Sequence, residues 1–348
     1  MRTIRTLIIL VCFASVGLLV LSCGDDDGGQ PTLVVLTHSS FDIDRELVAR
    51  FEQEHHVTVD IRKGGDANEV VNRALLNAGN PEGDVLYGID NLTLPRTVGK
   101  GLFEEYTSAL RDRIPSDVRA GLGDSREVTP IDYGYVALNF DRAKGTAPSR
   151  LEDLTNAAWR GKLVVEDPTT SSPGLQFLAT TVAQFGETGS YTWKDYWRDL
   201  RANDVLVVDG WDAAYNTYFS RNGGDRPVVV SYTTSPAAEV FFSEGKLSEP
   251  PTSNVIPAGT KLFRQVEAAG VLRGTKQPEL AGQFIDFLLS DDVQAHIPET
   301  MFVYPVMPGL ATPDWWQWAK VDVQPAALSV DGPTIERWVR EWTDIMRR

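Results

Sequence analysis

A cluster of hydroxyl groups follows a strongly apolar stretch and is the most promising place for chemistry in the chain. Residues 228–230 are three consecutive valines, which is typical of a buried strand, and residues 231–235 then read Ser-Tyr-Thr-Thr-Ser. Pro236 indicates the first turn of a helix, where backbone N–H groups have no partner within the helix. Such a strand end can hold a polar small molecule at the edge of a sheet. The alternative is an ordinary capped helix with Thr234 or Ser235 as its N-cap.

Two further stretches combine polar or aromatic side chains with the expected start of a helix. Glu166 and Asp167 end an expected strand, and Ser172-Pro173 opens a helix whose free N–H groups can meet a hydroxyl or a phosphate. A simple capped helix is the alternative there. Trp211 lies directly before a helix expected over residues 213–221, and an aromatic face binds a cationic ring at roughly 0.5 to 2 kcal/mol per contact. Tyr215, four residues later, is expected in the core.

Acidic side chains near strand ends are the remaining polar candidates. Asp66 lies where a Gly-Gly turn meets an expected helix, so it is either a ligand contact or an N-cap. Asp84, Asp90 and Asp132 are interpreted as capping or solvated acids.

Sequence motifs of known enzyme classes are missing from the chain. It contains no His-Glu-x-x-His, no Gly-x-Ser-x-Gly, no Walker loop and no Gly-x-Gly-x-x-Gly. The four histidines are too scattered to indicate a metal site. We therefore expect no catalytic residue, no metal ligand and no cofactor.

The chain from residue 32 onward alternates between strand and helix patterns. These patterns predict a parallel α/β sheet with helices on both faces, since right-handed crossovers join parallel strands. The expected elements are strands at 32–36, 57–61 and 84–87, with helices that bury Ile43, Leu47 and Phe51 and then Val70, Val71, Ala74 and Leu75.

A second alternation of strands and helices predicts a second lobe. Residues 128–140 have strand character and are interpreted as a first crossing between lobes, and residues 228–232 as the return. Two α/β lobes joined by two crossings are typical of a binding protein that closes about a hinge. The predicted division is 32–131 for the first lobe, 132–231 for the second, 232–305 for the return to the first, and 306–348 for a C-terminal helical segment that packs on the lobes.

The N-terminus has the pattern of a secretory signal. Arg2 and Arg5 precede an apolar run over 7–21, and Ser22-Cys23 resembles the end of a bacterial lipobox. We expect residues 1–22 to be a signal peptide and residues 23–31 to be a lipidated Cys23 followed by a flexible tether. The protein would then be anchored to the membrane outside the cytoplasm, in the periplasm or at the cell surface. A plain signal peptide that is cut elsewhere is the alternative.

Composition limits the partners of the chain. The formal net charge is −15, and removal of 1–22 takes away two arginines and no acid, which makes it −17. Such an acidic chain argues against nucleic acid and mildly favours a cationic small molecule, although acidity also serves solubility. Cys12 and Cys23 are the only cysteines, so the mature chain is expected to be stabilised by packing without a disulfide.

An ordered series of short motifs resembles the thiamine-binding subunits of bacterial ABC importers. The resemblance implies a type II-like, two-lobed periplasmic-binding fold that closes on thiamine or a thiamine phosphate and delivers it to a membrane permease, without catalysis. The matching segments are 37–41, 83–91, 132–135, 167–174, 210–215, 231–236, 276–281 and 304–306.

The same resemblance implies a set of ligand contacts. Thiamine has an aminopyrimidine, a positively charged thiazolium and a hydroxyethyl tail that can carry phosphate. Asp66 and the hydroxyl cluster would hold polar ends, Ser171 would meet the tail, and Trp211 would supply an aromatic face. The implied contacts are Asp66, Ala67, Ser171, Trp211, Tyr232, Thr233, Thr234 and Ser235.

Three positions depart from the pattern of that family. His38 stands where the family can have a stacking Tyr, Phe302 where it can have a Trp, and Ala67 where Gly is also found. We keep His38 and Phe302 among the expected ligand contacts. His38 is expected to be mostly neutral near pH 7, and its protonated form would repel a thiazolium, which predicts weaker binding near about pH 5.

Other functions remain open at this point. The same fold can carry a polyamine, for which Asp66, Glu166 and Asp167 would supply acids. It can also carry ferric iron, although the adjacent tyrosine pair that iron favours is missing. An extracellular hydrolase that uses Ser171 or Ser231 has no evident base partner.

Overall fold

The computed structural model describes residues 30–256, 262–321 and 329–347. The predicted signal peptide, Cys23 and the tether up to residue 29 lie outside these ranges, so they stay predictions. Within the described ranges, no helix is long and apolar enough to span a membrane.

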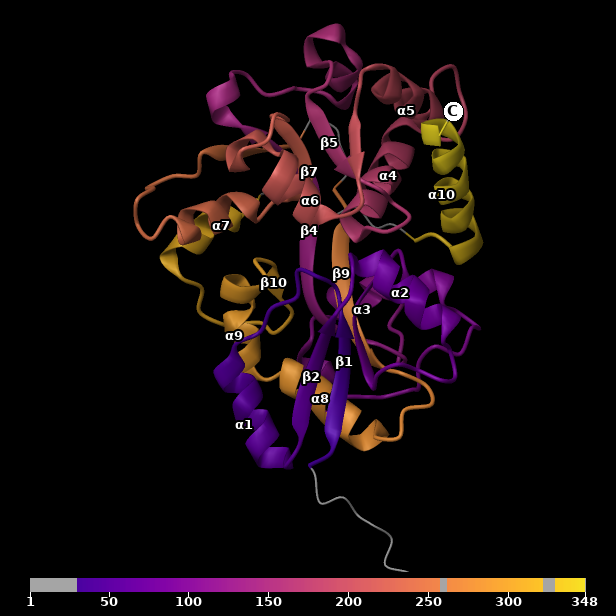
Figure 1. Cartoon of the computed structure of the whole chain (residues 1–348), viewed down its shortest axis with the longest axis vertical. Helices are drawn as coiled ribbons and strands as arrows, with labels where there is room; N and C mark the ends of the chain where they lie inside the picture. The colour runs from indigo at the N-terminus through magenta and orange to yellow at the C-terminus, as the bar shows by residue number, and fades with distance from the viewer. Residues whose placement is uncertain (1–29, 257–261, 322–328, 348) are drawn as a thin grey trace, which may run out of the picture.

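One series of paired strands runs along the length of the molecule and through both lobes (Figure 1). Its order is β2-β1-β3-β9-β4-β7-β5-β6, and both β8 and β10 pair with β4. The strands are β1 (Thr32–Thr37), β2 (Thr58–Lys63), β3 (Val85–Asp90), β4 (Thr129–Asp141), β5 (Leu163–Glu166), β6 (Leu206–Val208), β7 (Val228–Tyr232), β8 (Thr252–Val255), β9 (Arg264–Val271) and β10 (Tyr304–Pro305).

Helices cover both lobes. They are α1 (Arg45–His55), α2 (Ala67–Leu76), α3 (Ser116–Gly121), α4 (Ser172–Phe185), α5 (Trp193–Ala202), α6 (Trp211–Ala213), α7 (Ser235–Phe242), α8 (Pro278–Leu288), α9 (Asp291–Thr300) and α10 (Gly332–Arg347), with a π turn at Ala214–Tyr218 and a 3-10 helix at Asp314–Ala319.

The first lobe has the predicted parallel arrangement. β1 pairs in parallel with both β2 and β3, and Val35 faces Ile61 on one side and Val85 on the other. Phe51 of α1 packs edge-on against Phe284 of α8, with ring centroids 5.3 Å apart. Asp44 caps α1, whose first residue lies two positions beyond the Ile43 that the sequence placed within this helix.

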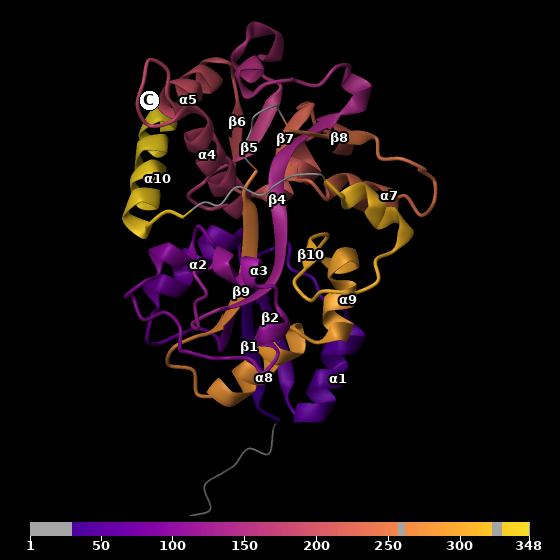
Figure 2. The same cartoon turned by 180° about the vertical axis from the view of Figure 1, so that it is seen from behind.

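β4 joins the two lobes, as predicted for residues 128–140. Its first part, up to Tyr135, pairs antiparallel with β9, and its second part, from Val136, pairs with β7. Both views show β4 passing through the junction (Figures 1 and 2). A single continuous strand therefore belongs to both sheets.

The predicted return to the first lobe at residue 232 is wrong. β7 pairs with β4 on one side and β5 on the other, so it is a central strand of the second lobe, and this position explains its three valines. β8 then pairs with the end of β4, from Leu138 to Asp141, which keeps the following segment in the same lobe. The chain rejoins the first lobe only at β9, which lies between β3 and β4.

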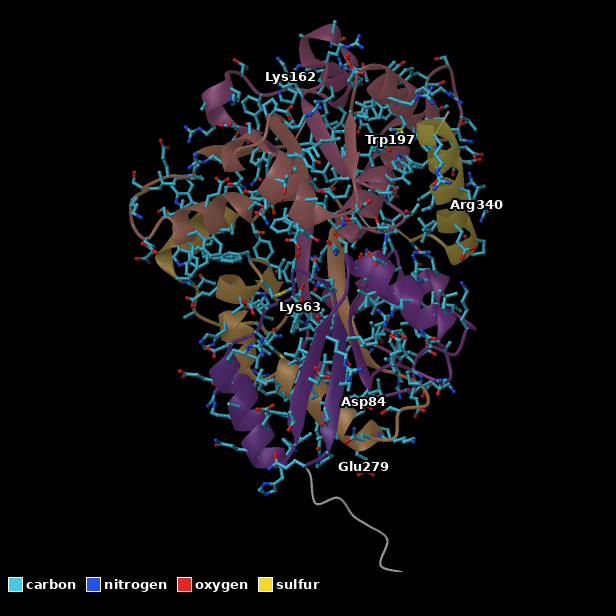
Figure 3. The ribbon with its side chains drawn as sticks, viewed as in Figure 1. Lys63, Asp84, Lys162, Trp197, Glu279 and Arg340 are labelled. Carbon is cyan, nitrogen blue, oxygen red and sulfur yellow. The ribbon has the colours of Figure 1, made fainter. Side chains whose placement is uncertain are left out.

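The second lobe has its own aromatic core, and the terminal helix completes it. Trp193 and Trp197 of α5 are fully buried, and Trp342 of α10 packs edge-on against Trp197, with ring centroids 5.6 Å apart. Figure 3 shows Trp197 on the inner side of α10 and Arg340 pointing outward. The expected packing of the C-terminal segment on the lobes thus takes the form of α10 lying against α5.

Removal of the Trp342 ring should destabilise the protein. Trp342→Ala leaves a cavity beside Trp197, so we expect the free energy of unfolding to fall by about 3–5 kcal/mol, measured by urea denaturation. Arg340→Ala, on the exposed face of the same helix, is the control and should change stability by less than about 0.5 kcal/mol. Equal effects of the two substitutions would contradict the packing of α10 described here.

Candidate functional site

A cavity of about 690 Å³ opens between the two lobes, within the range of roughly 300 to 1,000 Å³ that is common for small-molecule sites. Of the ten ligand contacts expected from sequence, eight line it: His38, Asp66, Ala67, Trp211, Tyr232, Thr234, Ser235 and Phe302. The cavity therefore brings together residues that lie far apart in the chain.

Ser171 and Thr233 do not line the cavity. Ser171 is fully buried and its hydroxyl accepts the Gly174 N–H at the start of α4, which corresponds to the alternative of a capped helix. Thr233 is also fully buried, and its N–H donates to the Tyr135 carbonyl of β4. Both positions serve the fold of the second lobe in this structure, and the contact of Ser171 with a ligand tail stays a prediction that this arrangement does not favour.

The Asp66 carboxylate connects the two lobes. One oxygen accepts the Ala67 N–H at 2.6 Å and caps α2, while the other accepts the Trp211 N–H of the second lobe at 2.9 Å. A Cβ at Gly210 would stand 2.9 Å from that second oxygen, so glycine allows the close approach. Asp66 is therefore an N-cap, as the alternative reading of the sequence had it, and also the point where the cleft is closed.

The first turn of α2 docks on the loop that precedes α4. Asn68 donates its side-chain amide to the carbonyls of Pro168 and Ser171, each at 3.0 Å, and the Glu69 N–H donates to the Thr170 carbonyl at 3.0 Å. Asn68 is fully buried. Sequence reasoning gave Asn68 no individual role, although it is the second residue of α2 and follows the turn at the end of β2.

Trp211 presents a rigidly held aromatic surface. Its ring stacks on Tyr215, with centroids 5.0 Å apart and planes at 14°, and its indole N–H donates to the Ser231 hydroxyl at 2.8 Å. Ser231 in turn bonds to Ser235 at 2.8 Å. The helix expected over 213–221 is instead the short α6 and a π turn, and the stack with Tyr215 belongs to the cavity wall as well as to the core.

Phe242 and Phe302 line the cavity and form its aromatic rim, and two further rings pack against Phe302. Phe302 packs against Phe242 of α7 at 5.0 Å and against Phe241 at 5.5 Å, and Trp315 lies 6.1 Å from Phe302. Phe302 has a φ of 54°, a left-handed conformation that costs a bulky residue on the order of 1 kcal/mol. This backbone conformation places a non-glycine residue at the cavity edge at an energetic cost.

Acidic side chains outnumber basic ones in the cavity wall. Five carboxyl groups line it, while Lys63 and Arg221 are its lysine and arginine among the described residues, and both are exposed. Figure 3 shows Lys63 near the junction of the lobes. The carboxyl groups belong to Asp42, Asp66, Asp212, Glu239 and Glu267. A cavity with this balance favours a cationic ligand.

His38 and Glu267 form a pair in the cavity wall, with Nε2 3.4 Å from Oε1. Burial lowers the pKa of His38, but the carboxylates of Glu267, Asp66 and Asp212 together outweigh it, so the pKa is raised above its ordinary value. The environment thus favours the charged imidazolium, opposite to the neutral ring expected from sequence. Sequence reasoning missed Glu267, the one acid in strand β9.

Asp132 and Asp90 are both buried, so neither is a solvated acid. Asp90 is a capping acid, as one of the two interpretations had it, and Asp132 is neither. Asp132 lies opposite Glu267 in the pairing of β4 with β9 and accepts the Tyr87 hydroxyl. Burial raises the pKa of Asp132 well above its usual range, and the Glu267 carboxylate adds to the shift. Asp90 accepts the N–H groups of Leu92 and Thr93 and the hydroxyl of Ser172.

Glu166 lies behind the cavity and not in its wall. It is fully buried, and neither carboxyl oxygen has a hydrogen-bond partner among the described residues. Burial raises the pKa of Glu166 well above its usual range. With Asp167 bonded to the Thr169 N–H and also absent from the cavity wall, neither residue supplies the acids expected for a polyamine.

Glu166→Gln should make stability less dependent on pH. The folded protein keeps a proton on Glu166 at pH values where the unfolded chain has lost it. The stability of wild type therefore falls as pH rises above the pKa of Glu166 in the unfolded chain, which is about 4.3. The loss is at most about 1.4 kcal/mol per pH unit and ends at the pKa of Glu166 in the folded state. The amide has no such loss. Urea midpoints at about pH 5 and about pH 8 should therefore differ less for Glu166→Gln than for wild type.

The exposed residue Glu279 provides a matched control for this measurement. Glu279→Gln should reproduce the wild-type dependence of the urea midpoint on pH. A Glu166→Gln protein that loses as much stability as wild type between the two pH values would show that Glu166 is ionised in the folded state.

Comparison with known proteins identifies relatives along nearly the whole chain. The family described as bacterial extracellular solute-binding protein matches residues 80–323. A thiamine-binding periplasmic protein of Escherichia coli is 28% identical over 339 residues, which cover 95% of this chain and 98% of that protein. The iron uptake protein A2 of Synechocystis is 29% identical over 258 residues, 70% of each chain. Among solved structures, a periplasmic thiamin binding protein superposes with a TM-score of 0.78 at 26% identity, covering 92% of this chain and 97% of that one.

Proposed function

Because the chain belongs to the bacterial extracellular solute-binding protein family, we propose that it is an extracytoplasmic subunit of an ABC importer that binds thiamine between its lobes. The observation that carries this proposal is the Trp211–Tyr215 stack facing an acidic cavity. The similarity to thiamine-binding proteins along most of the chain supports the same ligand.

The chemistry of the cavity fits the three parts of thiamine. The flat rings can stack on Trp211, with a gain of roughly 0.5 to 2 kcal/mol where a cation meets the aromatic face. The carboxylates attract the thiazolium, and the hydroxyl groups of Tyr232, Thr234 and Ser235 can bond to polar ring atoms or to the hydroxyethyl tail. The aromatic rim around Phe302 would exclude water from one side of the ligand.

Closure of the lobes would trap the ligand. The bonds from Asp66 to Trp211 and from Asn68 to the loop before α4 link the lobes, and β4 continues through the junction. A ligand that contacts both walls favours the closed state by its differential affinity. Opening at the permease would then release thiamine for transport.

Anchoring through a lipidated Cys23 is part of the proposal. Two or more acyl chains on an N-terminal cysteine would hold the protein at the membrane surface, close to the permease. Expression of Cys23→Ser in the native host should move the protein from the membrane fraction to the soluble fraction. Retention of this variant in the membrane fraction would refute lipidation as the anchor.

A polyamine is the second candidate, because five carboxyl groups and an aromatic stack line the cavity. Ferric iron is less well supported, since the sequence has no adjacent pair of tyrosines to supply the phenolate ligands that iron favours. A hydrolase that uses Ser231 or Ser171 is not supported, because the Ser231 hydroxyl is bonded to Trp211 and Ser235 and the Ser171 hydroxyl caps α4.

The test is a calorimetric titration of the purified protein, unfolded and refolded beforehand to remove any retained ligand. We expect one thiamine per chain with a dissociation constant of about 1 μM or below, and the two phosphates of thiamine can be ranked in the same way. Saturable heat with spermidine and none with thiamine would instead establish the polyamine reading.

Trp211→Ala should weaken thiamine binding more than tenfold, because it removes the stacking face and the bond that orients it. Tyr191→Ala is the control and should bind like wild type, because it removes a partly exposed ring that packs edge-on against Phe185 at the end of α4 and does not line the cavity. An unchanged affinity of Trp211→Ala in the same calorimetric titration would remove Trp211 from the site.

A further inference from the structure

Glu267 and His38 have a role in the cavity that the family resemblance does not assign to them. Both side chains are about nine-tenths buried, both line the cavity, and their charged atoms are 3.4 Å apart. Their geometry is that of an ion pair without an aligned hydrogen bond, so the His38 Nε2 has no hydrogen-bond partner among the described residues. A buried carboxylate of this kind needs a compensating positive charge.

Acids and tyrosines from several elements surround the pair, and Tyr232 of β7 lies near Glu267 as well. Asp66 at the start of α2 and Asp212 of α6 both act on His38, and Asp132 of β4 lies opposite Glu267. Tyr87 of β3 donates its hydroxyl to Asp132 and packs 5.7 Å from the His38 ring. In the described ranges, the imidazole is therefore the cationic group in direct contact with Glu267.

We propose that Glu267 is the carboxylate that binds the positive charge of the ligand, and that His38 releases a proton when the ligand enters. This inference rests on the proposed function, because it requires a cationic ligand in the cavity.

The reason is competition between two cations for one carboxylate. With the cavity empty of ligand, the imidazolium of His38 balances Glu267. A thiazolium about 4 Å from the imidazolium would be disfavoured by roughly 4 kcal/mol at an effective dielectric constant of about 20. Deprotonation of His38 removes this repulsion: the imidazolium N–H bond breaks, the proton passes to the buffer, and the ligand cation takes over the neutralisation of Glu267.

Asp132 cannot take this role in place of Glu267. Its carboxyl group lies outside the cavity wall and is engaged by the Tyr87 hydroxyl. Burial and the neighbouring Glu267 raise the pKa of Asp132 well above its usual range, so its carboxyl group favours the neutral form. The cluster thus keeps the same net charge before and after the exchange of a proton for a cation.

The exchange determines how affinity depends on pH. The pKa of His38 is raised in the free protein and would be lowered by a bound cation, so the proton is released at pH values between the two. Affinity should increase with pH through this window, by up to about tenfold per pH unit, and become constant above it. Binding should therefore be weaker in acid, as expected from the sequence, because His38 then keeps its proton.

The experiment is thiamine titration calorimetry at about pH 7 in buffers of different ionisation enthalpy, where the slope of the observed heat gives the number of protons exchanged. We expect wild type to release a substantial fraction of one proton, and His38→Gln to bind thiamine with almost none. Glu267→Gln should weaken binding at least tenfold, because the ligand charge loses its partner.

The outcomes separate this inference from the proposed function. Binding of thiamine without proton release between about pH 6 and pH 8, or equal release by wild type and His38→Gln, would overturn the exchange and leave thiamine binding intact. If wild type binds no thiamine at all, the proposed function fails and the inference fails with it. If Glu267→Gln binds like wild type, another carboxylate meets the ligand and the assignment of Glu267 is wrong.

Discussion

The Asp66 carboxylate is the interaction on which the arrangement of the two lobes depends. It caps α2 with one oxygen and receives the Trp211 N–H with the other, so one side chain fixes both the start of a helix in the first lobe and the position of the aromatic wall in the second. Gly210 makes this approach possible. A ligand on Trp211 would therefore lie beside a hydrogen bond that joins the two lobes.

Acids outnumber bases in the cavity wall, but individual acids have a bonded or charged partner nearby. Five carboxyl groups face few permanent cations, and this arrangement is tolerated because individual acids are bonded or paired: Glu239 accepts the Tyr215 hydroxyl, and Glu267 lies beside His38. Burial raises the pKa of Glu239, although the bonds from Thr252 and Tyr215 oppose the shift. The excess of carboxyl groups over basic groups makes the cavity suited to a cation. The same excess makes the protonation of His38 sensitive to the charge of a bound ligand.

Strand β4 connects the sheets of the two lobes. Its first part belongs to the first lobe with β9, and its second part belongs to the second lobe with β7 and β8. A continuous strand can bend but cannot separate, so relative motion of the lobes is confined to rotation about the junction. The cavity lies beside this junction, where a small rotation changes the distance between its walls. Separate cores on either side keep each lobe rigid during such a motion.

The sequence by itself determined the type of most elements, the parallel sheet of the first lobe and the crossing at β4, because periodicity and helix caps are local properties of the chain. Eight of the cavity residues were expected from the family resemblance of its short motifs. The tertiary structure decided that β9 and not β7 returns to the first lobe, that Ser171 is buried as a cap, and that Glu267 faces His38. The place of β9 and the contact of Glu267 with His38 depend on which segments meet across a hundred residues or more, whereas the cap formed by Ser171 is local and was one of two options that the sequence left open. Long-range pairing is selected by the packing of the whole sheet, which leaves no local pattern in the residues that it brings together.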